Sequence, residues 1–279
     1  MTNNSLSQSS PALDSGSHSK PGLTSSRRNP VRAVRRLVGL ARVCAKGCYR
    51  VISRSVREGW SAPMVAVESQ IWAQRLLSSC NIIPRVHGEL PNVAAVFVAN
   101  HRSYIDIAVL NASLPCSFMA KSELASWPVI GYTARKGNVI FVKRADRDSR
   151  RRAREAVATR LLEGISTVVF VEGTTHAGPG ILDFSPGIFV MAAGNNFPVV
   201  PIAFDYPEPE DAWIGNDDFV SHFLRVFSKR EVRAEMSVGP VLQDSDPEKL
   251  RDAAWNWVSD EVTRLQRVRQ EPTWPWRNV

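Results

Sequence analysis

The sequence predicts an α/β fold in which a central mixed, mostly parallel sheet is flanked by helices, with a basic amphipathic helical arm on its N-terminal side. Short, nearly continuous apolar runs alternate with longer helical patterns between residues 94 and 265, and such runs are typical of strands that are covered on both faces. The 279 residues are 44% hydrophobic and 22% charged, so the chain can bury a core of useful size.

The first segment, residues 1–30, is rich in Ser and contains few large apolar side chains, so we expect a disordered tail. From residue 31 onward, apolar and basic residues separate onto two sides of a helix with about 100° between successive residues. The apolar side carries Val31, Val34, Val38, Ala41, Ala45, Cys48, Ile52 and Val56, and the basic side carries Arg32, Arg35, Arg42, Lys46, Arg50, Arg54 and Arg57.

The net positive charge of the chain lies in residues 1–57. Residues 1–57 carry eleven Lys or Arg and one acid, Asp14, whereas residues 58–279 carry 24 basic and 26 acidic side chains. A basic amphipathic helix of this kind lies in a membrane interface and binds anionic lipid rather than crossing the bilayer. With a second helix expected at 62–79, residues 31–80 form a helical membrane-interface segment, whose contact with anionic lipid is expected through residues 31–57. The alternative is a helix that packs on the domain and exposes its basic side to solvent.

Two further patterns bear on location. No run approaches the ~20 consecutive apolar residues of a membrane-spanning helix, and the N-terminus lacks the basic region, apolar stretch and cleavage site of a secretory signal. The four cysteines make neither a disulfide framework nor a metal-ligand spacing with a histidine. We therefore expect no metal, and a peripheral or monotopic protein on the cytoplasmic face of the cell membrane.

Residues 81–279 are expected to form one α/β domain without internal repeats. A closing amphipathic helix is marked by apolar residues between positions 250 and 265, and other helices are expected at 103–113, 147–163 and 187–193. Strands are expected at 94–99, 117–120, 139–143, 167–171, 199–204 and 233–238.

A polar segment with a histidine, residues 100–106 (NHRSYID), directly follows the first of these strands. An imidazole titrates near neutrality, so His101 can remove a proton from an alcohol that attacks a carbonyl, and the Asp106 carboxylate can hold the ring in the required tautomer. Five residues correspond to about 140° on a helix. His101 must therefore precede the helix, and Asp106 must reach back from its first turn.

Three more blocks follow in order: 137–144 (GNVIFVKR), 170–175 (FVEGTT) and 199–202 (VVPI). Each block alone is common, but the four in this order resemble the signature of the 1-acylglycerol-3-phosphate acyltransferase family, the glycerolipid and lysophospholipid acyltransferases. The resemblance extends over roughly residues 56–265.

This resemblance implies that residues 81–279 are an acyltransferase catalytic domain with His101 as general base and Asp106 as the group that orients it. A hydroxyl of a lysolipid acceptor would attack the thioester of acyl-CoA or acyl carrier protein directly, without an acyl-enzyme and without a cofactor. The resemblance further assigns substrate binding to Arg144, Glu172, Gly173, Thr174 and Thr175.

The third block departs from members that form phosphatidic acid, which usually have Pro before the Glu and Arg after Gly-Thr. Here these positions are Val171 and Thr175, and Thr175 cannot supply a second cation for a phosphomonoester. Two acceptors therefore stay open: 1-acyl-sn-glycerol-3-phosphate (lysophosphatidic acid), as in phospholipid biosynthesis, and another lysolipid such as lyso-ornithine lipid or a lysophospholipid.

The same residues also suit two other classes of function. A hydrolase could use His101 to activate water and release free fatty acid. A non-enzymatic protein could dock on anionic lipid or nucleic acid through its arm, but the arm lacks the interleaved aromatic residues on which bases stack, so we expect no nucleic-acid partner. The binding protein also leaves the four blocks unexplained.

Overall fold

The computed structural model describes residues 28–126, 130–215 and 217–271. Most of the expected N-terminal tail, residues 1–27, lies outside the described residues. Residues 28–30, which we also assigned to the tail, belong to the folded part: helix α1 begins at Pro30, and Asn29 is its N-cap. The Asn29 side chain accepts the backbone N–H of Arg32, and its own N–H donates to the carbonyl of Ser228.

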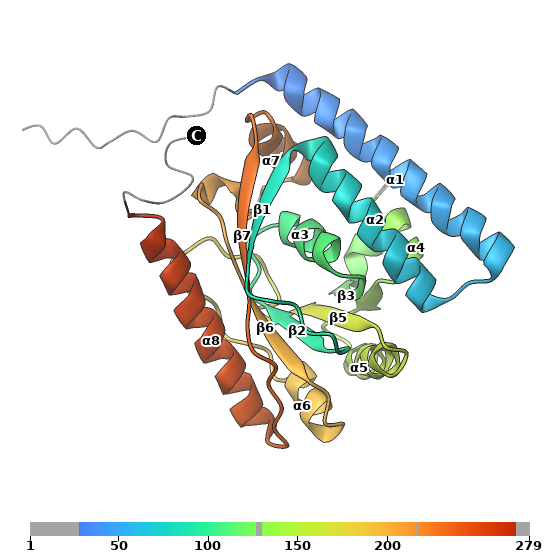
Figure 1. Ribbon diagram of the computed structural model, residues 1–279, viewed down its shortest axis with the longest axis vertical. Coiled ribbons are helices and arrows are strands. Elements are labelled where there is room, and N and C mark those ends of the chain that lie inside the picture. The colour runs from blue at the N-terminus through green and yellow to red at the C-terminus, as the bar shows by residue number, and fades with distance from the viewer. Residues whose placement is uncertain (1–27, 127–129, 216, 272–279) are drawn as a thin grey trace, which may run out of the picture.

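A seven-stranded sheet forms the centre of the fold (Figure 1) and confirms the expected mixed, mostly parallel architecture. Its order is β1-β7-β6-β2-β5-β3-β4, and among these neighbours β6 and β7 pair antiparallel while the others pair parallel. The strands are β1 (Ile82–His87), β2 (Val96–Ala99), β3 (Cys116–Lys121), β4 (Ile140–Val142), β5 (Ser166–Phe170), β6 (Val199–Asp205) and β7 (Val232–Val238).

Helices cover both faces of the sheet, as expected. One face packs against α2 (Ala62–Cys80), α3 (Ile105–Ser113) and α7 (Phe219–Phe227), and the other against α5 (Arg147–Leu162), α6 (Gly187–Gly194) and α8 (Pro247–Val268). α1 (Pro30–Glu58) lies outside α2, so this side of the molecule has an additional helical layer (Figure 1). A short α4 (Ile130–Lys136) follows β3, and two single-turn helices span Ser122–Ser126 and Pro209–Asp211.

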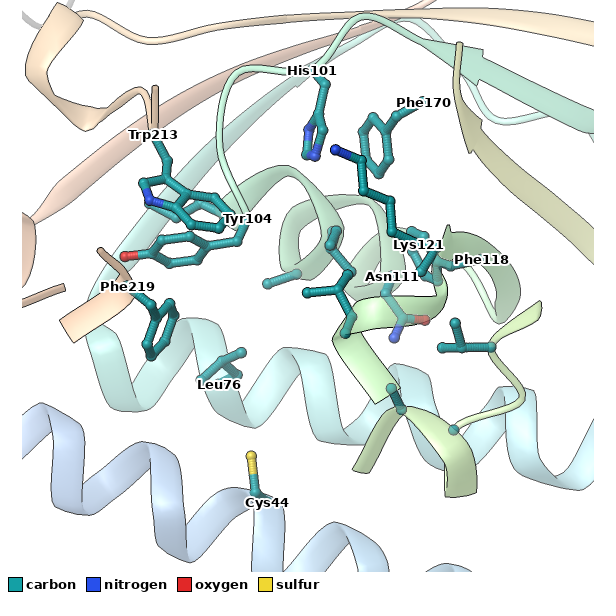
Figure 2. A pocket seen from close by; sticks show the side chains of 18 of the residues that line it. Cys44, Leu76, His101, Tyr104, Asn111, Phe118, Lys121, Phe170, Trp213 and Phe219 are labelled. Atoms are coloured by element: carbon teal, nitrogen blue, oxygen red, sulfur yellow. The ribbon is translucent and has the colours of Figure 1, made fainter. Parts of the chain in front are cut away.

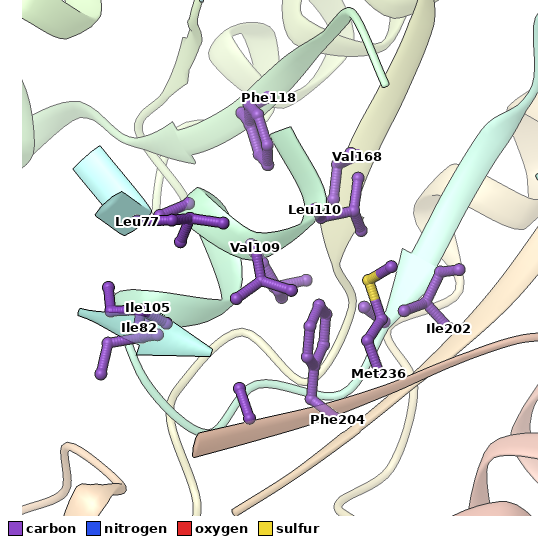
Figure 3. Close-up of a cluster of buried hydrophobic side chains, with 14 of the residues drawn as sticks. Leu77, Ile82, Ile105, Val109, Leu110, Phe118, Val168, Ile202, Phe204 and Met236 are labelled. Carbon is purple, nitrogen blue, oxygen red and sulfur yellow. The ribbon is translucent and has the colours of Figure 1, made fainter. Parts of the chain in front are cut away.

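Strand β2 shows why the apolar runs are continuous. All four of its residues are buried. Phe97 and Ala99 join the core under α3, part of which Figure 3 shows, whereas Val96 and Val98 join the core on the opposite face. Because successive side chains of a strand point to opposite faces, a strand between two helical layers must be apolar at every position.

Helix α1 packs on the domain through a third face, which the sequence analysis did not single out. Its buried residues include Ala33, Cys44 and Val51, which lie between the two sides distinguished in the sequence. Most of the expected apolar side faces outward: Val34 is 54% exposed and Val56 is 82% exposed. The helix therefore presents an exposed apolar stripe beside its basic side. Among the described residues, no helix is long and apolar enough to cross a membrane.

The parallel strands fix where polar side chains gather. β2, β3, β4 and β5 run in the same direction, so their carboxyl ends meet at one edge of the sheet. Ligands of open α/β sheets bind at this edge. His101, Lys121, Arg144 and Glu172 end these strands or follow them within two residues.

Candidate active site

The structure places His101 and Asp106 in direct contact. His101 lies two residues after β2, and Asp106 is the second residue of α3. Nδ1 of the imidazole is 2.9 Å from Oδ2 of the carboxylate. Because a carboxylate accepts, Nδ1 carries the proton and donates it to Asp106, which leaves Nε2 as the proton acceptor. The His101 side chain is 16% exposed and lines the main cavity of the protein.

A stacking contact also holds the imidazole ring of His101 in place. Its ring stacks on Phe170, the last residue of β5, with 3.9 Å between ring centroids and an interplanar angle of 19°. The neighbouring Asn100 bonds the β6 backbone with both ends of its amide, donating to the carbonyl of Phe204 and accepting its N–H. The loop that carries His101 is therefore tied to both strands beside β2.

Asp106 is fully buried, and four donors contact its carboxylate. Besides the His101 ring, Oδ2 accepts the backbone N–H groups of Arg102 at 2.7 Å and Ser103 at 2.9 Å, and Oδ1 accepts the Tyr206 hydroxyl at 2.5 Å. Hydrogen bonds from these donors fix both oxygens of the carboxylate in place. Asp106 can therefore orient the His101 ring and stabilise it once it gains a proton.

The Glu172 carboxylate contacts the backbone behind the histidine. Its Oε2 accepts the backbone N–H of His101 at 2.7 Å, and its Oε1 accepts the backbone N–H of Leu182 at 2.7 Å. Burial raises the pKa of this carboxyl group. The described residues that line the main cavity do not include Glu172, so its carboxylate holds two loops together in this structure.

The other four residues assigned to substrate binding do line that cavity: Arg144, Gly173, Thr174 and Thr175. Gly173 has a φ of +75°, which favours glycine, and a Cβ on it would come within 3.0 Å of Nη1 of Arg144. The Arg144 guanidinium donates to the Gly173 carbonyl. A planar guanidinium has five N–H donors, so Arg144 keeps donors for an anionic group of a ligand.

Arg102, the residue after the histidine, is a buried clamp that the sequence did not single out. Its guanidinium donates to the carbonyls of His176 at 2.7 Å, Gly178 at 3.1 Å and Gly180 at 2.7 Å. The backbone N–H of His176 in turn donates to the carbonyl of His101 at 2.9 Å. The loop that follows the Glu-Gly-Thr-Thr block is thereby fastened to the histidine segment.

The cavity itself has a volume of about 490 Å³ and is mostly apolar. His101 stands at one end (Figure 2), and α1, α2, α3 and α7 contribute residues to the walls together with β3 and the loops at the sheet edge. Cys44 and Leu76 represent the walls from α1 and α2. Such a chamber can take up a hydrocarbon chain, because each buried methylene group contributes about 0.8 kcal/mol.

Three further lining residues were missed by the sequence analysis. Lys121, the last residue of β3, reaches toward His101, while Tyr104 and Trp213 lie on the other side of the cavity (Figure 2). Our expected strand stopped at residue 120, one position short of Lys121. Lys121 reaches this edge because β3 lies between β5 and β4 in the sheet, an order that the sequence alone does not show.

Comparison with known proteins gives a consistent result. Residues 83–205 match the family model described as Acyltransferase. The lyso-ornithine lipid O-acyltransferase of Pseudomonas aeruginosa is 34% identical over 160 residues, which cover 56% of this chain and 62% of that protein, slightly less than two thirds of it. The enzyme of the same name from Rhizobium meliloti is 31% identical over 207 residues, covering 67% and 68% of the two chains. The 1-acyl-sn-glycerol-3-phosphate acyltransferase of Neisseria gonorrhoeae is 35% identical over 118 residues, covering 42% and 46%.

A solved structure shares the fold. The crystal structure of the 1-acyl-sn-glycerophosphate (LPA) acyltransferase PlsC from Thermotoga maritima superposes with a TM-score of 0.61 at 22% identity, covering 84% of this chain and 98% of that one. The four blocks, the mostly parallel sheet and these similarities agree. The chain therefore belongs to the acyltransferase family whose members include O-acyltransferases of lyso-ornithine lipid and of 1-acyl-sn-glycerol-3-phosphate.

Proposed function

We propose that this protein transfers a fatty acyl group from a thioester donor to a hydroxyl of a lysolipid at a membrane surface. One observation carries the proposal. His101, whose Nδ1 lies 2.9 Å from Oδ2 of Asp106, stands at the end of a cavity whose walls are mostly apolar. A base beside an apolar chamber suits a reaction between an activated fatty acid and an alcohol.

The proposed reaction needs no covalent enzyme intermediate. Nε2 of His101 takes the proton of the acceptor hydroxyl while the hydroxyl oxygen attacks the thioester carbonyl carbon. The C–S bond then breaks, and the imidazolium returns the proton to the departing thiolate. The products are an ester and a free thiol. Asp106 acts by holding the ring and stabilising its positive charge during the step.

For the acceptor, the comparisons support lyso-ornithine lipid better than lysophosphatidic acid, our first interpretation of the four blocks. Two relatives that carry the lyso-ornithine name match over 160 and 207 residues, whereas the lysophosphatidic acid relative from Neisseria gonorrhoeae matches over 118. Thr175 also stands where an arginine would help to bind a phosphomonoester. Lys121 and Arg144, at the same end of the cavity as His101, can bind the carboxylate of an amino-acid head group.

We also propose that α1 lies in the membrane interface on the cytoplasmic side, where soluble thioester donors are present. Support comes from its outward stripe, on which Val31 is 65% exposed and Val56 is 82% exposed. The inner face of the same helix lines the cavity through Leu40, Cys44 and Cys48. A helix with this arrangement would bring a membrane-bound acceptor close to the reacting groups.

The experiment that tests this function is a transfer assay with purified protein and vesicles. Labelled acyl-CoA and acyl carrier protein are offered separately with lyso-ornithine lipid, lysophosphatidic acid and lysophosphatidylcholine, and the products are identified by mass. We expect the acylated ornithine lipid as the main product. Acylation of lysophosphatidic acid alone would reject the proposed acceptor, and release of free fatty acid with every acceptor would reject acyl transfer.

A further inference from the structure

A second concave site lies on the outside of the molecule, where α1 passes the end of α2. From α1 its described lining includes Arg35, Gly39 and Arg42, and from the end of α2 it includes Ser79 and Asn81. The other lining residues are Val31, Arg32, Val34, Arg36 and Val38. We call this site the α1 groove. The described part of its wall contains arginines and valines but no acidic side chain.

Two of the four arginines of the groove form hydrogen bonds within the protein. Arg36 is buried and donates to the carbonyls of Phe227, Lys229 and Arg230, which end and follow α7. Arg32 donates to the carbonyl of Ser228 at 3.0 Å. These hydrogen bonds hold α1 against the end of α7, so Arg32 and Arg36 already have partners within the protein.

The other two arginines remain unpaired. Arg35 and Arg42 are exposed, and neither forms a hydrogen bond or an ion pair with any residue that the structure describes. Further along the same helix, Arg50 and Arg54 are neutralised by Glu68 and Glu58. The free positive charge of the N-terminal half of α1 is therefore concentrated at the α1 groove.

Gly39 gives this groove its floor. It lies four residues after Arg35 and three before Arg42, so the three share one side of the helix, and the two arginines stand about 10.5 Å apart along its axis. A Cβ at Gly39 would come within 2.4 Å of Oγ of Ser79. The glycine thus lets α2 approach closely, and the Ser79 hydroxyl lies against the backbone of α1 between the two arginines, where Gly39 and Ser79 both line the groove.

We propose that the α1 groove binds the phosphate head group of one anionic phospholipid of the membrane, held between Arg35 and Arg42. Guanidinium groups bind phosphate oxygens with paired hydrogen bonds. The exposed Val31 and Val34, which also line the groove, would contact the adjoining acyl chains, and this sets the arginines at head-group depth. The proposal rests on the interfacial position of α1 under Proposed function, and adds a discrete lipid site to a general electrostatic attraction.

The test uses a soluble short-chain phosphatidylglycerol below its micelle concentration, so that attraction to a charged surface plays no part. Binding to the full chain is measured by calorimetry or NMR at ~0.15 M salt, where the screening length is about 8 Å. The groove variant is Arg35→Gln/Arg42→Gln, and the control variant Lys46→Gln/Arg57→Gln removes two charges from the same helix outside the groove.

We expect saturable one-to-one binding, weakened about tenfold or more in the groove variant and less than about twofold in the control, as expected when two close charge-assisted contacts are lost. Short-chain phosphatidylcholine and inorganic phosphate should bind much more weakly than phosphatidylglycerol. Equal loss in the two variants, or equal binding of inorganic phosphate, would overturn the proposal. Because the measurement is of binding and not of turnover, His101→Ala should bind phosphatidylglycerol like wild type, and a failed acyl-transfer assay would leave this result unaffected.

Discussion

The carboxylate of Glu172 accepts the backbone N–H of His101 over 2.7 Å, and its other oxygen accepts the backbone N–H of Leu182 over the same distance. Both oxygens are thus engaged with the main chain of the loops behind the site. The resemblance to the acyltransferases assigned Glu172 to substrate binding, whereas these contacts indicate a residue that positions His101 and the loop at Leu182.

Replacing Glu172 separates these two roles. In Glu172→Gln only one end of the side chain can accept an N–H, so one charge-assisted bond is lost, worth about 1.5–3 kcal/mol. We expect a lower free energy of unfolding and a lower kcat, with little change in the KM for the lysolipid. Denaturant unfolding and steady-state kinetics check this, with the exposed Glu163→Gln as control. A raised acceptor KM at unchanged stability would instead support direct substrate binding.

Arg102→Lys tests the clamp on the loop at residues 176–180. A lysine keeps the charge but cannot reach three carbonyls in the geometry of a guanidinium. We expect the loop beside Thr174 and Thr175 to loosen, so that the KM for the lysolipid rises several-fold while the KM for the thioester donor stays the same. Hydrogen exchange should show faster exchange in this loop. Equal changes in both KM values would indicate a general loss of structure.

We expect the free energy of unfolding to decrease at acidic pH because of a buried histidine. His222 donates from Nε2 to the carbonyl of Ala212, accepts the Tyr104 hydroxyl at Nδ1, and has its pKa lowered by burial from 6.5. The unfolded chain therefore takes up a proton before the folded one does. The stability that neutral His222 contributes to the folded protein is fully present above about pH 6.5 and is lost as the pH falls below that value.

Melting temperatures between pH 8 and pH 5 measure this effect. We expect the wild type to lose stability progressively below about pH 6.5. His222→Gln keeps hydrogen-bonding groups but does not titrate, so its melting temperature should be lower at pH 8 and should change less with pH. Parallel curves for the two proteins would assign the acid sensitivity to other groups.

The exposed stripe of α1 should govern attachment to membranes. Val34→Asp and Val56→Asp place a charge on the outward side of the helix, where both side chains are more than half exposed. We expect each to weaken binding to anionic vesicles with little change in the melting temperature, because neither packs in the core. Vesicle sedimentation checks this. The control is Val241→Asp, at an exposed valine after β7. An equal loss of binding in the control would show that the stripe does not govern membrane attachment.

Much of the sheet was predictable because its strands are continuous apolar runs bounded by polar loops. β2, β5 and β6 lie at the centre, are buried on both faces, and were expected within two residues of their observed ends. β1 was missed. It is an edge strand that pairs only with β7 in the described sheet, and it contains Pro84 and Arg85, so it has no apolar run to mark it.

The nine-residue helix α7 was also missed, although the sequence marks it: Asp218 caps its N-terminus, and Phe219, Phe223 and Phe227 recur at the four-residue spacing of one helix face. Its Phe223 and Phe227 complete the core on the α3 side.

The approach of His101 to Asp106 could be argued from their spacing and the strand end, whereas the contacts that hold them could not. Tyr206 is 100 residues from Asp106 in the sequence, and Leu182 is 81 residues from His101. Such partners are brought together by the order of the strands. The packing face of α1 was likewise out of reach, since it depends on where α2 lies and on Gly39 and Gly47, which let the two helices approach.

The central claim is that the imidazole of His101, oriented by Asp106, activates a lysolipid hydroxyl. The most direct measurement is the rate of acyl-lipid formation by wild type, His101→Ala and Asp106→Asn at matched fold stability. We predict no measurable transfer by His101→Ala and a kcat lowered about 10²- to 10⁴-fold in Asp106→Asn. Transfer by His101→Ala at a rate near that of wild type would contradict the account.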